Sequence, residues 1–358
     1  MSISRHSAIR RGPAILEFSW RTKSGTQWTT HTYRVRTQGD VVFTPETRTF
    51  DIPSSELGTI DRRASEKLAT CTFTPVGVVD ADGISILWPH LAKWPGQSLF
   101  GARDVTLCVW PVAGADASSN DNSFIIMENV AVTKMPSITL SPTKTAIGQV
   151  EVRGILSDDH IWGCDTHWHM TDESAPTLAA LDPASIITAP ATLAWGGWDN
   201  IRTKDGVTIE FDMETQDEEE DEAGIYDITL VDLKARAHFT PVAGWDMDDL
   251  YDRLHNQDDL YRGGRVFRAD VTATSKEPGG LIVNLYGCSL LTMPMTYGAT
   301  SPRLGELTLE GLRGTGNAIA AITLATAQTA SPRSTSAATP GDGVGGGDGE
   351  GDGEGTGT

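Results

Sequence analysis

The segment Phe73-Thr74-Pro75-Val76 decides the fold, because it returns later in the chain as Phe239-Thr240-Pro241-Val242. Other matches keep the offset that relates position 73 to position 239, which we call the main offset, and several of them cluster in short runs. A register that holds over so long a stretch indicates an internal duplication. The further matches at the main offset are Arg36-Thr37 with Arg202-Thr203, Gly58 with Gly224, Asp61 with Asp227, Asp80 and Asp82 with Asp246 and Asp248, and Asp104-Val105-Thr106 with Asp270-Val271-Thr272.

The ends of the two copies follow from matches at slightly different offsets. Met135-Pro136 matches Met293-Pro294, and then Gly148 and Gly154 match Gly305 and Gly311 at a shorter offset, which we call the late offset. At the front, Pro13-Ala14 and Leu16 match Pro190-Ala191 and Leu193. We therefore expect a basic arm at 1–12, copy 1 at 13–156, a connector without a counterpart at 157–188, copy 2 at 189–315 and an Ala/Thr-rich, then Gly/Asp/Glu-rich disordered tail at 316–358.

Within each copy the dominant hydrophobic period is two. Ala69, Cys71 and Phe73 share one parity, which predicts a half-buried strand that ends at Pro75. A helix-like spacing follows each Thr-Pro-Val motif, so each copy is predicted to be mostly antiparallel β with one short helix. The helix positions are Ile84, Leu87, Trp88 and Leu91 in copy 1 and Leu250, Tyr251 and Leu254 in copy 2, and further strands are expected at 105–109, 124–132, 150–152, 282–285 and 307–309.

The charge of the chain narrows the class of function. Its 358 residues carry a net charge of −20, which argues against a protein that grips a nucleic-acid backbone or an anionic membrane. Residues 213–227 hold eight acidic side chains and no basic one, and residues 341–358 hold five. Residues 1–36 are basic instead, with seven Lys and Arg and a single acidic residue, Glu17. No apolar run approaches the roughly 18 residues that cross a bilayer, so we expect no membrane partner.

Four motifs together resemble phage virion proteins of the tail tube type. They are "FTPVG" at 73–77, "LWPHL" at 87–91, "PGQSLFG" at 95–101 and "AVTKMPSITLSPTKTAIGQVEV" at 131–152. The resemblance implies two tandem β-sandwich domains, each with a flanking helix, whose sheets join those of neighbours into a ring-forming barrel. Six such domains line a ring in that family, so a chain with two copies would close a ring as a trimer. Copy 2 departs from the pattern at Leu254-His255 and Arg262-Gly263-Gly264.

The same resemblance implies a function and a set of partners. The expected protein is a non-enzymatic major tail tube subunit without a cofactor, which self-assembles into stacked rings and lets DNA pass without specific binding. Its expected partners are tail completion, tape measure and baseplate proteins, and its place is the virion, after assembly in the cytoplasm of a bacterial host. Another virion part, such as a baseplate or capsid decoration protein, is the alternative within this class.

One cluster of side chains suggests a different class of function. His160, Cys164, His167 and His169 lie within ten residues of the connector and could supply ligands to zinc in a metal-binding enzyme or binding module. The spacing is unusual for a structural zinc site, and Trp162 and Trp168 lie among these residues, so packing of the connector is the preferred interpretation. The four cysteines, Cys71, Cys108, Cys164 and Cys288, are too scattered for a disulfide framework and are expected to be reduced thiols.

Paired carboxylates also admit two interpretations. Asp158-Asp159 and the run Asp246, Asp248 and Asp249 could serve acid/base chemistry or calcium binding, but the second run is better explained as capping the predicted helix. The acidic run at 214–222 aligns with 48–56 of copy 1, and we expect it on a hairpin or loop that contacts the next ring. There it would meet the basic arm around Arg5, Arg10 and Arg11.

Overall fold

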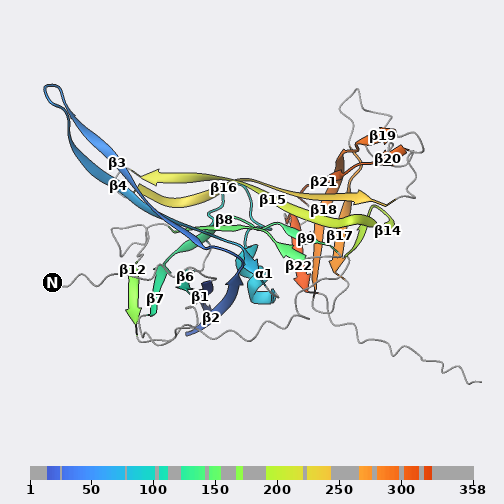
Figure 1. The fold of residues 1–358 in the computed structure, drawn as a ribbon, viewed down its shortest axis with the longest axis horizontal. Coiled ribbons are helices and arrows are strands. Elements are labelled where there is room, and N and C mark those ends of the chain that lie inside the picture. The colour runs from blue at the N-terminus through green and yellow to red at the C-terminus, as the bar shows by residue number, and fades with distance from the viewer. Residues whose placement is uncertain are drawn as a thin grey trace, which may run out of the picture. The chain divides into compact units, whose positions relative to one another are not determined.

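The structure is a computed structural model that describes residues 14–24, 26–76, 79–100, 105–111, 122–141, 145–154, 167–171, 191–220, 224–242, 266–275, 280–297, 302–313 and 318–324. Within these ranges the chain forms antiparallel β-sheets and one helix, α1 (Ala81–Leu87) (Figure 1). The predicted all-β class with a short helix is therefore confirmed. The second predicted helix, at 250–254, lies outside the described residues.

The first half of the chain forms two sheets. One has the strand order β12-β7-β6-β1-β2-β5 and the other the order β3-β4-β11-β8. Figure 1 shows β3 and β4, in blue, as one long two-stranded hairpin. The strands are β1 (Ala14–Ser24), β2 (Gln27–Thr37), β3 (Val42–Ser54), β4 (Gly58–Phe73), β5 (Pro75–Val76), β6 (Thr106–Pro111), β7 (Asn122–Met127), β8 (Val130–Lys134), β11 (Val150–Gly154) and β12 (His167–Thr171).

The second half forms a ten-stranded sheet that also takes in two strands of the first half. Its order is β10-β9-β15-β16-β21-β18-β17-β13-β14, with β22 paired to β18. A separate two-stranded sheet joins β19 to β20. The strands are β9 (Ile138–Leu140), β10 (Thr145–Ile147), β13 (Ala191–Trp195), β14 (Trp198–Ile201), β15 (Thr203–Glu220), β16 (Gly224–Pro241), β17 (Ala269–Ser275), β18 (Leu281–Thr292), β19 (Met295–Tyr297), β20 (Pro302–Leu304), β21 (Leu307–Gly311) and β22 (Ala320–Leu324).

The two halves repeat the same strand pairings in the same register. In the first half Cys71 of β4 lies opposite Val152 of β11. In the second half Ala237 of β16 lies opposite Leu309 of β21. The main offset relates Cys71 to Ala237, and the late offset relates Val152 to Leu309. The pairings β3–β4, β1–β6, β6–β7 and β11–β8 likewise correspond to β15–β16, β13–β17, β17–β18 and β21–β18.

Irregularities of the sheets are repeated as well. In each half the long hairpin, which is β3–β4 or β15–β16, has two register shifts at equivalent places. A third equivalent shift lies between β11 and β8 in the first half and between β21 and β18 in the second. A β-bulge adds one residue to a strand and bends it, so equivalent bulges give the two halves the same local curvature. The extra residues are Ser65 and Val231, Ile60 and Tyr226, and Thr133 and Leu291.

The match at the front of the copies needs a correction. Phe18 of β1 lies opposite Leu107, and Leu193 of β13 lies opposite Ala273. Because the main offset relates Leu107 to Ala273, the equivalent of Leu193 is Phe18 and not the expected Leu16. This register superimposes Trp20 on Trp195, which are both buried. The two registers differ by two residues and therefore bury the same face of the strand, so alternation alone does not distinguish them.

The expected strand at 124–132 is also wrong as a single strand. It consists of β7 and β8, which lie in different sheets and are separated by Asn129, whose φ of 47° is left-handed. The second half has one long strand there, β18, but Gly287 has a φ of 53° at the equivalent position. Asparagine and glycine tolerate this conformation best, so both halves change direction at the same point.

Two further expectations are corrected at the ends of the copies. We expected residues 316–358 to be a disordered tail, but residues 320–324 form β22, since Ala320 and Ile322 are buried beside β18. The connector was expected to lack a counterpart, yet β12 pairs with β7 as β22 pairs with β18. The last strand of each half, β12 or β22, therefore pairs with the equivalent strand, β7 or β18.

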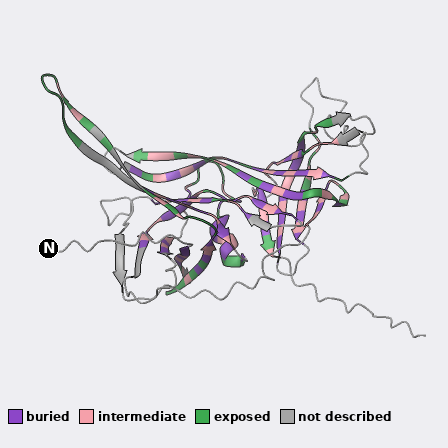
Figure 2. Ribbon diagram, in the orientation of Figure 1, coloured by how far each residue is buried: buried purple, intermediate pink, exposed green. Residues whose placement is uncertain are grey.

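Most buried side chains of the two halves form one continuous core. Ala69, Cys71 and Phe73 are at most 2% exposed, as their common parity predicts, and buried residues alternate with less buried ones along the strands (Figure 2). Helix α1 covers part of this core through Ile86 and Leu87. It ends at Leu87, earlier than the pattern through Leu91 suggested, because Pro89 has no N–H to continue the helix.

Candidate assembly interface

Strand β9 of the first half pairs with β15 in the sheet of the second half. Ile138, Thr139 and Leu140 of β9 lie opposite Ile209, Thr208 and Val207 of β15. The four apolar side chains are at most 1% exposed, and the hydroxyl oxygens of the two threonines are 3.3 Å apart. Strand addition of this kind removes an open sheet edge, which otherwise invites uncontrolled pairing.

Gly206 allows the chain to come this close. Its φ is +96°, and a Cβ placed there would lie 2.1 Å from the carbonyl oxygen of Leu140 and 2.7 Å from Cα of Ser141. Only glycine combines the left-handed conformation with room for this approach. No motif in the sequence indicates this contact, and its only local signal is the Asp-Gly dipeptide at 205–206, at the start of an alternating strand.

A second contact lies along β16. The amide of Leu99 donates to the carbonyl of Ile228 at 2.7 Å, and the amide of Leu230 donates to the carbonyl of Gln97 at 2.9 Å. The hydroxyl of Ser98 donates to Asp227 at 2.6 Å. Residues 97–99 of the "PGQSLFG" motif therefore form a short strand-like contact with β16 of the long β15–β16 hairpin.

A third contact joins the segment after α1 to the end of the second half. The guanidinium of Arg313 donates to the carbonyl of Lys93 at 2.5 Å and lies 5.7 Å from the ring of Trp94. The amide of Ile319 donates to the carbonyl of Leu91 at 2.9 Å. This side of the junction therefore combines a main-chain hydrogen bond with two contacts of the Arg313 guanidinium.

An ion pair completes the junction. Nη1 of Arg153, on β11, donates to Oδ1 of Asp217, on β15, at 2.7 Å, and both side chains are largely covered. Partial burial weakens screening by salt, so this pair contributes more than an exposed one does. Asp217 belongs to the acidic run, and part of that run therefore serves a contact inside the chain.

The rest of the acidic run follows the distal part of β15, as the expected hairpin position predicts. The described part of the run, from Glu214 to Glu219, is intermediate or exposed, and Glu218 accepts from the hydroxyl of Thr229 at 3.0 Å. The basic residues proposed to meet it, Arg5, Arg10 and Arg11, lie outside the described residues. That contact therefore stays a prediction.

The candidate metal ligands are only partly described. His167 and His169 lie on β12, opposite Ile126 and Phe124 of β7. His160 and Cys164 lie outside the described residues, as do Asp158-Asp159 and the run from Asp246 to Asp249. Within the described ranges no group of three or more His, Cys, Asp and Glu could hold a metal ion.

The described cysteines are free thiols. Cys71 and Cys288 are fully buried and Cys108 is partly buried. Burial raises the pKa of Cys71 and of Cys288 to about 12 and that of Cys108 to about 11, so these thiols stay protonated at neutral pH. Such thiols are poor nucleophiles and suit a packing role.

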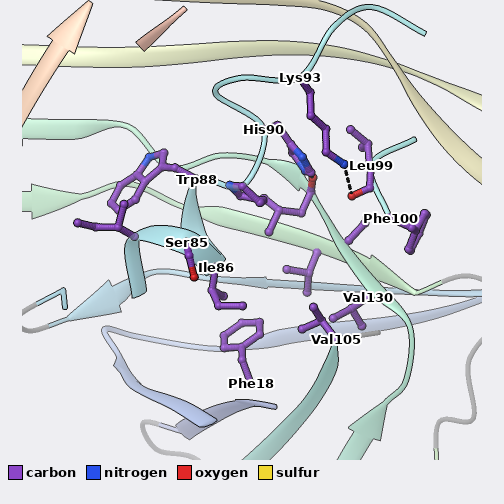
Figure 3. A pocket seen from close by; sticks show the side chains of 15 residues that line it. Phe18, Ser85, Ile86, Trp88, His90, Lys93, Leu99, Phe100, Val105 and Val130 are labelled. Carbon is purple, nitrogen blue, oxygen red and sulfur yellow. Dashed lines mark hydrogen bonds between the residues drawn. The ribbon is translucent and has the colours of Figure 1, made fainter. Parts of the chain in front are cut away.

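A cavity of about 380 Å³ lies beside α1 (Figure 3). Its lining is mostly apolar. Nζ of Lys93 donates to the carbonyl of Ser98 and, at 2.9 Å, to that of Leu99, and Nε2 of His90 donates to the carbonyl of Val132 at 2.8 Å. Nδ1 of His90 is buried without a hydrogen-bond partner among the described residues. Burial is the main cause that lowers the pKa of His90 to about 3, so the ring is neutral. Ser85, which supplies the hydroxyl group of the lining, donates it to the carbonyl of Asp82 at 2.8 Å.

Two comparisons with known proteins found no match. A scan against protein-family models found no match, and a search of curated proteins found none either. None of the described helices is long and apolar enough to span a membrane.

Proposed function

We propose that this protein is the major subunit of a phage tail tube. It consists of two tandem β-sandwich domains and assembles as trimeric, pseudo-hexameric rings that stack into a hollow conduit for DNA. One observation carries the proposal: within a single chain, a strand of the first half extends the sheet of the second half, while both halves share one pattern of strand pairing.

That arrangement supports assembly because the contact is head-to-tail. A heterologous contact between equivalent units generates a closed ring when its rotation closes, and an open filament otherwise. In a duplicated chain one of every two such contacts is intramolecular and has a high effective concentration. A ring of six domains then needs only three chains.

The charge of the chain supports passage of DNA rather than binding of DNA. A basic channel would hold phosphates, whereas an acidic or neutral channel repels them and lets the polymer slide. The net charge of −20 suits such a conduit. The protein acts as a structural element without a catalytic role, with the tail completion, tape measure and baseplate proteins as its neighbours in the virion.

Negative-stain electron microscopy of the purified full chain tests this proposal. We expect hollow tubes, or rings with sixfold features, and light scattering of the smallest ring should give a mass of three chains. A chain that remains a monomer at all protein and salt concentrations would overturn the proposal. A solid, unbranched fibre without a central channel would overturn it as well.

A further inference from the structure

The second half carries the same short hairpin that the first half uses at the junction. Moving β9 and β10 by the late offset gives the bounds of β19 and β20. The same main-chain hydrogen bond closes both hairpins, from Gly148 to the carbonyl of Ser137 and from Gly305 to that of Pro294, each at 2.7 Å. The two hairpins are therefore equivalent parts of the two halves.

The surroundings of these hairpins differ in one respect. The outer edge of β9 is covered by β15, whereas β19 has β20 as its only partner among the described strands. Met295, at the start of β19, is 37% exposed. The second half thus presents an edge strand of the kind that the first half buries.

The complementary edge lies at the start of β3. The part of β15 that receives β9, at positions 207–209, corresponds through the main offset to Val41, Val42 and Phe43. Among the described strands β3 is the last of its sheet, with β4 on one side only. Val42 is 52% exposed. An apolar residue on an uncovered edge strand is a liability in a monomer and suits a site of strand addition.

We propose that β19 of one chain adds to β3 of a second copy of the chain as an antiparallel neighbour. The register of the internal contact transfers to Met295 opposite Phe43, Thr296 opposite Val42 and Tyr297 opposite Val41. The inference deepens the proposed self-assembly by naming the two surfaces that meet, and it rests on that function for the closed ring.

The charges next to these edges fit such a contact. The internal ion pair of Arg153 and Asp217 corresponds to Glu310 and Asp51, which would place two carboxylates together. However, Arg62 takes the position of Ile228, and its Nε donates to Asp51 at 2.7 Å. Glu310 is likewise held inside its own chain, because Nε of Arg236 donates to it at 2.8 Å. Each of the two carboxylates is thus compensated by an arginine of its own chain, so the contact does not bring two unpaired like charges together.

One position departs from the internal contact. The counterpart of Gly206 is Asp40, and because a Cβ at Gly206 would lie 2.1 Å from the carbonyl oxygen of Leu140, Asp40 does not allow an equally close approach. We therefore expect the pair of Tyr297 and Val41 to be more open than its internal counterpart. The pairs of Val42 with Thr296 and of Phe43 with Met295 carry the contact.

Paired cysteines test the register in the full-length chain, with Cys164→Ser as the background. The test variant combines Val42→Cys with Thr296→Cys, because directly opposed residues in neighbouring strands lie within disulfide range. The internal equivalent, Thr139→Cys with Thr208→Cys, is the positive control, since those two hydroxyls are 3.3 Å apart. Val42→Cys with Tyr297→Cys is the out-of-register control, because adjacent residues of a strand point to opposite faces.

After mild oxidation and denaturing electrophoresis, the test variant should form covalently linked chains up to a closed trimer. The positive control should form only an internal bond, and the out-of-register control should stay unlinked. If tubes form while the test variant stays unlinked, the inference is wrong and the proposed function stands. Linked chains without tubes or rings support the inference and refute the tube, whereas unlinked monomers overturn both.

Discussion

Replacing Gly206 by alanine should separate the two halves at their junction. The new Cβ would lie 2.1 Å from the carbonyl oxygen of Leu140 and 2.7 Å from Cα of Ser141, both of which are main-chain atoms that cannot rotate away. The simplest relief is a displacement of β9 from β15. We therefore expect a loss of stability that is larger than the cost of the left-handed conformation alone.

The size of the effect follows from two contributions. Alanine in the left-handed region costs about 1 kcal/mol. Displacement of β9 partly exposes Ile138 and Leu140, which are fully buried and are each worth about 1.5–3 kcal/mol when completely covered. With incomplete exposure, the unfolding free energy should fall by about 3–4 kcal/mol in total. This is a large share of the roughly 5–15 kcal/mol of a typical protein.

Gly197→Ala is the matched control. Gly197 has a φ of +88°, close to that of Gly206, but nothing lies within 4 Å of the Cβ position. Urea unfolding, followed by tryptophan fluorescence, should show a loss of about 1 kcal/mol for the control. Amide hydrogen exchange should accelerate at Thr139 and Val207 only in Gly206→Ala. Equal losses in the two variants would refute the argument that close approach at Gly206 holds the junction.

Three further predictions concern titration, thiol reactivity and charge. Because the folded chain keeps His90 neutral with a pKa of about 3, while the unfolded chain protonates it near 6.5, the unfolding free energy should fall as the pH drops from 6.5 towards 3. This contribution amounts to at most about 1.4 kcal/mol per pH unit, His90→Gln should lack it, and equal slopes in urea unfolding would contradict the prediction. In a chain with Cys108→Ser and Cys164→Ser at pH 8, Cys71 and Cys288 should react with Ellman's reagent only after denaturation, and rapid reaction of the folded chain would contradict their burial. Replacing the acidic residues at 218–222 by their amides should weaken the salt dependence of tube formation measured by turbidity, and an unchanged dependence would disprove the predicted contact between rings.

The duplication is the part of the fold that the sequence predicts best. The Phe-Thr-Pro-Val motif and the glycines near the end of each copy gave the offsets that relate the strand pairs of the two halves. Alternation through Cys71 correctly predicted which face is buried. Local signals were less reliable where a strand changes sheet, because the left-handed residue Asn129 gives little warning in a run of apolar residues.

The candidate site was harder to predict, because its parts are far apart in the sequence. Ile138 and Ile209 form a register pair although a long stretch of chain separates them, and nothing in the motif that contains Ile138 indicates Ile209 as its partner. The His/Cys cluster attracted attention because its residues are close in sequence, yet its described members, His167 and His169, lie on one edge strand. Proximity in sequence is a poor guide to contacts that depend on strand pairing.

By itself, the sequence determined the all-β class, the duplicated plan and the inward parity of the strands, because these depend on the periodicity of hydrophobic side chains and on repeated motifs. Only the tertiary structure decided that β9 completes the sheet of the second half, while β19 and the start of β3 remain available. An edge strand has the same local sequence preferences whether or not it is covered. Its state depends on which distant segment reaches it, and therefore on the three-dimensional path of the whole chain.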